Sequence, residues 1–451
     1  MERPAALIRA HRAFTAVAAV LAICAASPAP AGARWTRAVD ISGSSSVDVL
    51  GPQIAASQAG AFAVSFNEVN MDFPATAAAF VALASPHGSF RTGRTAGPAV
   101  QEVLSLAFSG RTLELLTARS PVGLPCCTTV QVIRRQANGT LGRPHTIVSG
   151  VGGPAIGQLV PLANGNLLAV IAGPARLWVT EAVRTGRFAR PRGLTRRGVA
   201  PVALAVTGTP GGGSTVAWTQ GAGRSVISAN GPAGAAPSRP HTVLTVPAGH
   251  EIDGLQLVPR ADGLTIGWTE SWNDASGAYH SRAMAADLPG RRRRVRARAL
   301  SAAADVASGL SLATDGGDDQ VAAWDVCSSD TCAVHASVRN APRRWFRAAS
   351  RLGRIDPGET PQVTSAPLGG SLAGWITGGR VVIAQLRPGA SRFGHEHPIS
   401  GDIAANLDLA FGPTGTAVAT WTQGTFVTNV FATLSRRRQS RHSRPTRRHR
   451  P

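Results

Sequence analysis

Acidic and aromatic side chains gather where apolar runs of this chain end, and these residues could bind a polar ligand. Carboxylate oxygens beside an indole ring suit a calcium ion, a sugar or another polar ligand. The side chains that form the candidate binding site are Glu68, Asp72, Glu270, Trp272, Asp274, Asp325 and Asp330. The sequence therefore indicates a binding site with Ca²⁺ as one possible cofactor, provided that the fold brings these residues together.

A sequence repeat indicates which secondary-structure elements must position these candidate residues. A Gly-x-x-x-x-Trp motif recurs about every 50 residues, most plainly at Gly263–Trp268 and Gly370–Trp375. Aligning on this motif gives eight copies. Five of them keep the tryptophan, as Trp218, Trp268, Trp324, Trp375 and Trp421, and three replace it with Phe66, the Leu116/Thr117 pair and Ile171. We expect these side chains to pack between neighbouring units of the repeat.

Each copy follows a plan of four strands. A first apolar stretch, such as 406–411, leads through a glycine turn to a second that carries the tryptophan, such as Thr416–Trp421. A third stretch is exemplified by Val381–Leu386. The fourth contains an Arg-Pro-His motif at both Gly142–Ser149 and Ser238–Thr245, and its proline suits an edge strand.

Four antiparallel strands repeated at this spacing are typical of a β-propeller blade. The last copy lacks a fourth strand, and Arg34–Ser42 has the pattern of one. The sequence thus predicts an all-β fold, a β-propeller of eight four-stranded blades. The N-terminal strand would join the last blade and close the ring, and seven blades is the alternative count.

Loop length predicts which blades carry the site. The second-to-third-strand loops are long in blades 1, 2, 5 and 6, at 67–72, 120–128, 270–278 and 325–331. Long loops on a rigid scaffold are common binding sites. The candidate carboxylates fall in these loops, so we expect the site on the loop-rich face of these four blades.

Catalysis is the alternative interpretation. Two apposed carboxylates suffice for glycoside hydrolysis, and Glu68 or Glu270 could supply them. Tyr279, the only tyrosine, follows Glu270 closely, and retaining sialidases use a tyrosine–glutamate pair. The chain lacks the Ser-x-Asp-x-Gly-x-Thr-Trp motif of sialidases and offers no arginine triad. We therefore assign no catalytic residue and keep Glu68, Glu270 and Tyr279 as candidates for a glycan-active hydrolase.

The two ends of the chain have compositions of their own. Residues 1–33 combine a basic start, an apolar core at 14–26 and small residues before Arg34, which predicts a secretory signal peptide too short to span a membrane. A lipoprotein anchor at Cys24 is disfavoured because Ile23 is bulky. No other segment is apolar enough to cross a membrane. We expect a secreted or cell-surface protein with a propeller at 34–434 and a disordered Arg-rich tail at 435–451.

Charge places limits on the partners. The net charge is +21, and all 46 basic residues are arginines. The tail could contact anionic polymers by releasing counterions. Nucleic acid is an unfavourable partner, because no aromatic side chains alternate with the arginines to stack on bases.

Four cysteines follow the predicted signal peptide. Cys126 and Cys127 are adjacent in blade 2, whereas Cys327 and Cys332 belong to blade 6. Three pairings are formally possible. Because these blades would face each other across the ring, we expect Cys327–Cys332 and a vicinal Cys126–Cys127 bond. No zinc-type spacing is present, and we predict no metal centre.

From the tryptophan repeat, the glycine turns and the Arg-Pro outer strands, the chain resembles the secreted propeller-like repeat proteins of actinobacteria, over Arg34 to about Leu434. The resemblance implies an architecture and transfers no catalytic motif. We expect a monomeric, exported binding or scaffold protein. Its partner would be a carbohydrate, a peptide or another component of the cell envelope, bound through the loop-rich face.

Overall fold

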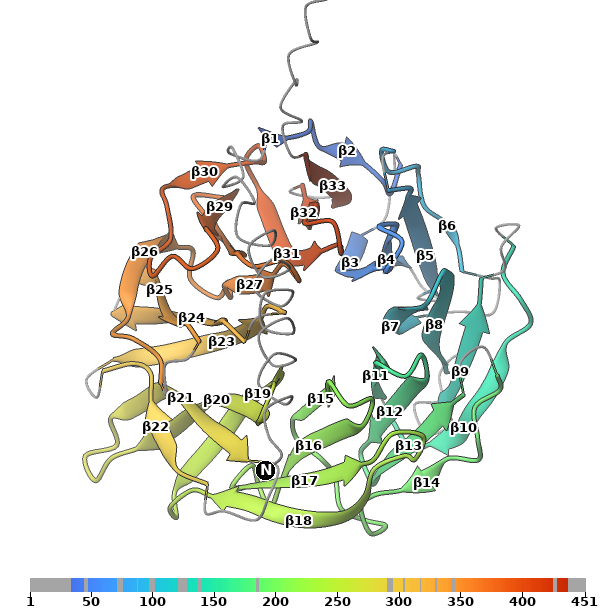
Figure 1. Cartoon of the computed structure of the whole chain (residues 1–451), viewed down its shortest axis with the longest axis horizontal. Helices are drawn as coiled ribbons and strands as arrows, with labels where there is room; N and C mark the ends of the chain where they lie inside the picture. The colour runs from blue at the N-terminus through green and yellow to red at the C-terminus, as the bar shows by residue number, and fades with distance from the viewer. Residues whose placement is uncertain are drawn as a thin grey trace, which may run out of the picture. The chain divides into compact units, whose positions relative to one another are not determined.

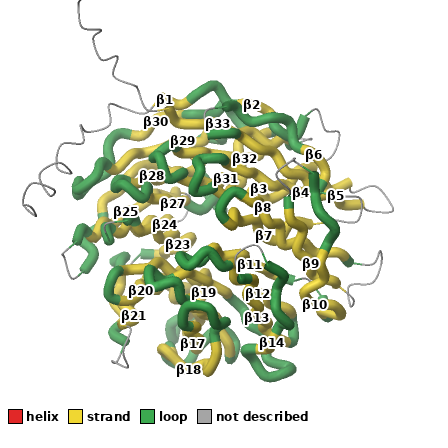
Figure 2. Tube along the Cα trace, turned by 45° about the vertical axis from the view of Figure 1, so that its right-hand side comes forward, coloured by secondary structure: helices red, strands yellow, loops and turns green. Residues whose placement is uncertain are grey.

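β-strands make up all the regular structure of the described residues (Figure 2). The computed structural model describes residues 34–43, 48–70, 76–86, 88–96, 102–120, 128–135, 140–153, 155–183, 186–289, 295–302, 305–316, 318–328, 331–341, 345–424 and 428–436. Trp35–Ser435 form one compact unit. Residues 1–33, with Cys24, and nearly all of the Arg-rich tail lie outside the described residues. Among the described residues, no helix is long and apolar enough to span a membrane.

Four-stranded antiparallel sheets follow one another along the first half of the chain. The first contains β3 (Asp48–Ala56), β4 (Phe62–Asn70), β5 (Thr76–Ala84) and β6 (Arg94–Thr95). The second contains β7 (Glu102–Ser109), β8 (Thr112–Arg119), β9 (Thr128–Arg134) and β10 (His145–Val151). The third contains β11 (Ile156–Pro161), β12 (Leu167–Gly173), β13 (Arg176–Ala182) and β14 (Arg192–Gly193). The fourth contains β15 (Leu204–Gly208), β16 (Ser214–Gln220), β17 (Ser225–Gly231) and β18 (Ser238–Thr245).

The second half of the chain also consists of consecutive four-stranded runs, and two of these runs are joined into one sheet. One four-stranded run contains β19 (His250–Arg260), β20 (Gly263–Asn273), β21 (Tyr279–Pro289) and β22 (Ala297–Ala299). The next contains β23 (Val306–Thr314), β24 (Gln320–Ser328), β25 (Thr331–Arg339) and β26 (Ser350–Ile355). A single parallel pair, Ser281 with Val306, joins these two runs into an eight-stranded sheet. A further sheet contains β27 (Gln362–Ser365), β28 (Ser371–Thr377), β29 (Arg380–Leu386) and β30 (Glu396–Pro398).

The last sheet takes strands from both ends of the compact unit. It contains β31 (Ala404–Phe411), β32 (Ala417–Gln423), β33 (Asn429–Arg436), β1 (Arg34–Trp35) and β2 (Val39–Asp40), and both N-terminal strands pair with β33. The expected pairing of the N-terminal segment with the last sheet is therefore present, as two short strands in place of one.

The arrangement is that of a β-propeller. In Figure 1 the first strand of each four-stranded run lies nearest the centre and the later strands lie progressively outward. Hydrogen bonding joins the described residues into seven sheets, one of which contains two runs, and none of these sheets closes on itself. The count of eight blades and the closed ring therefore stay predictions.

The motif tryptophans lie in the core. Each of the five is at most 1% exposed. Trp375 on β28 packs in one cluster with Val321 and Val334 of the preceding run, and Trp218 on β16 packs with Val170 and Leu177. Their expected role in packing between neighbouring runs is confirmed.

Side chains of the innermost strands also join neighbouring sheets. The Ser105 hydroxyl on β7 accepts a hydrogen bond from the Leu159 N–H on β11 at 3.0 Å. The Asp408 carboxylate on β31 accepts one from the Ile54 N–H on β3 at 2.9 Å. The second contact connects the last sheet to the first, so 354 residues of sequence separate its two partners.

Three of the expected long loops begin as strand. β20 continues to Asn273, so only 274–278 form the turn before β21, and β4 continues to Asn70. β24 likewise continues to Ser328. Glu68, Glu270 and Asp325 are therefore strand residues, not loop residues as expected. The reason is that the hairpins extend their pairing, as in the regular register between Trp272 and His280.

Candidate functional site

The sheet of β19, β20 and β21 extends beyond its neighbour. These strands contain 11 residues each, whereas β16 and β17 contain 7. The turn between β16 and β17 packs beside the longer sheet, where the Gly223 carbonyl accepts a hydrogen bond from Ile252 at 3.1 Å. Beyond this contact the strands continue as a projecting hairpin end.

Register places five polar and aromatic side chains on one face of this end. His250, Trp272 and His280 are cross-strand neighbours in one row, and Glu270 pairs with Arg282 in the next. Residues two apart in a strand share a face, so Glu270 and Trp272 lie on the same side as the buried Trp268. We call His250, Glu270, Trp272, His280 and Arg282 the platform.

Glu270 is the buried acid of the platform. The residue is 4% exposed, and its Oε1 lies 2.6 Å from Nδ1 of His250. Nη2 of Arg282 lies 3.4 Å from the same oxygen. Two cationic or hydrogen-bonding partners satisfy this carboxylate, so it holds β19, β20 and β21 together.

Trp272 is enclosed by its neighbours. The His250 ring stacks on it with centroids 4.8 Å apart and planes at 6°, and the His280 ring stacks at 5.4 Å and 18°. The guanidinium carbon of Arg282 lies 5.0 Å from the indole centroid. Cross-strand neighbours on both sides thus cover the indole, and a sugar could not stack on it without displacing them.

Asp274 begins the turn beyond the platform. Its carboxylate accepts hydrogen bonds from the Ser276 hydroxyl at 2.6 Å and the Ala278 N–H at 3.0 Å, and it lies 2.9 Å from Nε2 of His280. The hydrogen bonds from Ser276, His280 and Ala278 hold the pKa of this carboxyl well below its usual range. Asp274 therefore fixes both the turn and the His280 ring.

Tyr279 lies beside the platform but not on it. It is the first residue of β21, opposite Asn273, and is 57% exposed. Since side chains alternate along a strand, Tyr279 is on the face opposite to His280 and Arg282. Glu270 and Tyr279 accordingly do not share a face, as the hypothesis of a tyrosine–glutamate pair would require.

Asp325 belongs to a different environment on β24. It is buried, and its Oδ2 accepts a hydrogen bond from the Ser308 hydroxyl at 2.6 Å. Burial raises the pKa of this carboxyl despite the bond from Ser308. A Cβ on Gly309 would come within 2.6 Å of Asp325 Oδ1, so glycine is needed here both for space and for its φ of +60°.

The expected disulfide Cys327–Cys332 is present, and it closes the hairpin of β24 and β25 beside Asp325. Asp72, Asp330, Cys126 and Cys127 lie outside the described residues. Glu68 is on β4, in another sheet, where burial raises the pKa of its carboxyl.

The structure thus brings together only part of the predicted site. Glu270, Trp272 and Asp274 form one unit, and Glu68 and Asp325 belong to separate runs of strands. Within the described part of the chain, no three His, Cys, Asp or Glu side chains are grouped as a metal site.

Sequence reasoning missed His250 and Arg282. Both act on Glu270 only because the register of two strand pairs aligns them. The sequence signal that could have indicated this face is the alternation of side chains along a strand. His280 and Arg282 lie two residues apart after the turn, as Glu270 and Trp272 do before it.

Comparisons with known proteins concern the fold. The chain matches no protein-family model, and no curated protein matches it in sequence. Among solved structures it is similar to the polysaccharide lyase Uly1, with 9% identity and a TM-score of 0.49 over 76% of this chain and 91% of that one. An α-L-arabinofuranosidase of Fusarium graminearum shows 11% identity and a TM-score of 0.41, over 62% of this chain and 92% of that chain.

A third similar structure is an α-L-arabinanase of Penicillium chrysogenum, with 10% identity and a TM-score of 0.41 over 89% of this chain and 98% of that one. At these values the similarities carry no argument about the activity of this chain.

Proposed function

We propose that this chain is an exported binding protein whose platform recognises a protein or peptide partner in the cell envelope. The observation that carries the proposal is the projecting end of β19–β21, where Trp272 is held rigidly beside the partly exposed His280 and Arg282. Tryptophan and arginine are the side chains that most often dominate the binding energy of protein interfaces.

The enclosure of Trp272 favours a peptide over a sugar. Carbohydrate binding by tryptophan needs a free ring face, and both sides of this indole have stacked neighbours. A peptide can instead contact the indole edge, the guanidinium of Arg282 and the imidazole of His280 with its backbone and side chains. Because the side chains are already held in place, little rotamer entropy is lost on binding.

Export agrees with two features. Residues 1–33 have the composition of a signal peptide. The Cys327–Cys332 disulfide is of the kind that persists in oxidising compartments.

Binding of the labelled full chain to isolated bacterial cell envelopes tests this proposal. We expect saturable binding that protease treatment of the envelopes abolishes. Arg282→Ala and Trp272→Ala should each weaken binding at least tenfold, as hot-spot truncations do. The matched control is Arg354→Ala, which removes an exposed arginine from β26 and should leave binding unchanged. Binding that survives protease but is lost after glycan digestion would contradict a peptide partner.

A glycan-active hydrolase stays the alternative. It requires two carboxylates at one cavity. Glu68 and Glu270 lie on β4 and β20, and no hydrogen bond or ion pair among the described residues joins them to a common partner. Turnover of any glycan that Glu270→Gln abolishes, in a variant that keeps its fold, would favour the hydrolase.

A further inference from the structure

The net positive charge of the compact unit is concentrated in its first four sheets. Between residues 73 and 250 the sequence contains sixteen arginines and only three acidic residues, Glu102, Glu114 and Glu181. Between residues 251 and 435 it contains seventeen arginines and seventeen acidic residues, so the charges there balance. Such an uneven distribution gives the first four sheets a positive field that attracts anions.

The three acidic residues do not neutralise the outer edge of these sheets. Glu114 is buried, and its Oε1 lies 2.6 Å from Nε of Arg134. Glu181 is also buried, and it accepts a hydrogen bond from the Asn166 amide at 2.5 Å. Glu102 is the first residue of β7, the innermost strand of the second sheet.

An Arg-Pro motif marks the outermost strand of three consecutive sheets. It is present as Arg143-Pro144-His145 at the start of β10, as Arg190-Pro191-Arg192 at the start of β14 and as Arg239-Pro240-His241 within β18. Figure 1 shows β6, β10, β14 and β18 at the outer edge of the four sheets. Because proline has no N–H, these edges are poor templates for an added strand, and a partner would be bound by side chains.

Strand register repeats one basic position in all four sheets. In each, an exposed arginine or histidine of the outermost strand lies opposite the third-strand residue that pairs with the residue before the motif tryptophan or its replacement. The pairs are Arg94 with Val81, His145 with Val132, Arg192 with Val179 and His241 with Ser228. The repeat therefore places basic side chains at the same level of the outer edge, sheet after sheet.

Arginines also meet at the junction between the first and second sheets. Burial lowers the pKa of the Arg135 guanidinium, and the positive charge of the nearby Arg94 lowers it further. Leu141, the bridge partner of Arg135, packs against the core cluster that contains Val81, the strand partner of Arg94. Two like charges held together in this way favour an anion beside them.

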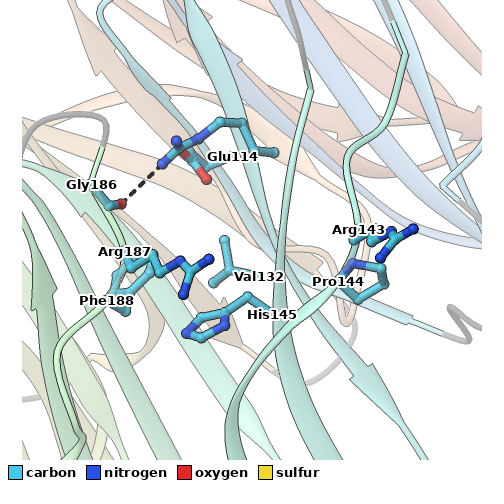
Figure 3. A pocket seen from close by; sticks show the side chains of 9 residues that line it. Glu114, Val132, Arg143, Pro144, His145, Gly186, Arg187 and Phe188 are labelled. Carbon is cyan, nitrogen blue, oxygen red and sulfur yellow. Dashed lines mark hydrogen bonds and ion pairs between the residues drawn. The ribbon is translucent and has the colours of Figure 1, made fainter.

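The next two junctions continue the basic edge. Arg143 lines a cavity of about 340 Å³ together with Arg187, which belongs to the segment between β13 and β14 (Figure 3). At the following junction, the Arg192 guanidinium donates hydrogen bonds to the carbonyls of Ala236 and Pro237, directly before β18. Basic side chains thus follow one another from the first sheet to the fourth.

Six arginines of this edge form what we call the basic rim: Arg94, Arg135, Arg143, Arg187, Arg190 and Arg239. Five of them are exposed and Arg135 is half-buried, and none forms an ion pair with a carboxylate among the described residues. Arg239 also has a φ of +57°, a left-handed conformation that is unfavourable for any residue with a Cβ. An arginine is therefore present where the backbone alone favours glycine.

We propose that the basic rim binds a linear polyanion, whose recurring carboxylate or phosphate groups meet arginines of successive sheets. A small anion could reach only one or two of these separated side chains, whereas a flexible polymer can follow the edge from β6 to β18. Binding of this kind releases counterions, so it weakens steeply as the salt concentration rises. Salt therefore separates it from binding at the platform, which belongs to a later sheet and is independent of the rim.

Fluorescence anisotropy of labelled polyphosphate and labelled polygalacturonate with the full chain tests the proposal. The variant Arg94→Gln/Arg143→Gln/Arg190→Gln/Arg239→Gln removes one exposed charge from each of the four sheets. Binding should weaken at least tenfold, and the slope of log K against log salt should fall by about 3, since each neutralised charge contributes about 0.7.

The matched control removes four exposed arginines from the half of the chain whose charges balance, as Arg351→Gln/Arg354→Gln/Arg387→Gln/Arg392→Gln. It has the same net charge as the rim variant, and its salt slope should stay close to that of the wild type. Equal weakening in the two variants would mean that net charge alone decides binding, and would overturn the proposal. Circular dichroism of both variants verifies that the fold is kept.

The Arg-rich tail is a second source of positive charge, so a further variant of the full chain has glutamine in place of the eight arginines after Ser435. This variant should still bind, and loss of all binding would overturn the role of the rim. A preference for one polymer would support the proposal and identify phosphate or carboxylate as the bound group, and binding of neither would overturn it. Tighter binding of single-stranded DNA would also overturn it, because no described aromatic side chain of these four sheets is exposed for stacking on bases.

Discussion

Nδ1 of His250 lies 2.6 Å from Oε1 of Glu270, and this contact joins the first residue of β19 to a buried carboxylate near the end of β20. It is the most buried polar contact of the hairpin end, because the side chain of Glu270 is far less exposed than those of His280 and Asp274. The projecting hairpin end therefore depends on a polar pair with little access to water. This explains why the strands stay paired beyond the limit of the neighbouring sheet.

His250→Ala should lower the free energy of unfolding by about 1–3 kcal/mol, the cost of leaving a buried charged group short of a partner. Urea denaturation at pH 7 measures the loss. The matched control is His280→Ala, which breaks an exposed pair with Asp274 and should cost about 0.5 kcal/mol, as surface pairs do. Equal losses in the two variants would show that the burial of Glu270 does not matter.

Local patterns in the sequence predicted the strands well. The expected third strand Val381–Leu386 is β29, which begins one residue earlier, and the expected fourth strand Ser238–Thr245 is β18. Alternation and glycine turns determine such hairpins within a few residues. The segment at 34–42 was harder to predict. It pairs with β33 at two short places separated by the stretch around Arg37, and no local sequence pattern indicates this interruption.

The candidate site was only partly predictable. Composition singled out Glu270, Trp272 and Asp274, which are neighbours in sequence. His250 and Arg282 come from the flanking strands, and their place depends on a register that a one-residue slip would reverse.

Truncation of the tryptophans should distinguish core from platform. Trp375→Ala removes a fully buried side chain packed against two sheets, and we expect a loss of about 3–5 kcal/mol. Trp272→Ala should cost less than half as much, because Trp272 is only partly buried and its neighbours can close over the gap. Guanidinium denaturation of both variants measures the difference. A larger loss for Trp272→Ala would show that the platform belongs to the core.

The Cys327–Cys332 disulfide closes a short hairpin loop. Loop entropy predicts a contribution of about 2 kcal/mol for so small a ring. The double variant Cys327→Ser/Cys332→Ser should therefore have a lower Tm than the oxidised protein, as measured by calorimetry. In the presence of a reductant, the Tm of the wild type should equal that of the variant. If the reductant also lowers the Tm of the double variant, the protein contains a second disulfide, as predicted between Cys126 and Cys127.

Asp408 should make the contact between the last and first sheets depend on pH. Burial raises the pKa of this carboxyl from 3.8 to about 6, although the N–H groups of Ile54 and Leu409 donate to it. A raised pKa means that the folded state binds the proton more tightly than the unfolded chain. The stabilisation from this group is then complete below about pH 4 and is lost as the pH rises through about 6.

Asp408→Asn supplies the reference, since asparagine does not titrate and all other groups remain. The difference in free energy of unfolding between the wild type and this variant should change by up to about 3 kcal/mol between pH 4 and pH 7, with the wild type losing stability relative to the variant as the pH rises. Urea denaturation across this range measures the change. A difference that stays constant with pH would mean that Asp408 titrates at its ordinary value, and that water reaches its carboxyl between the two sheets. The direction is the test, because a carboxylate stabilised by its two N–H donors alone would give the opposite slope.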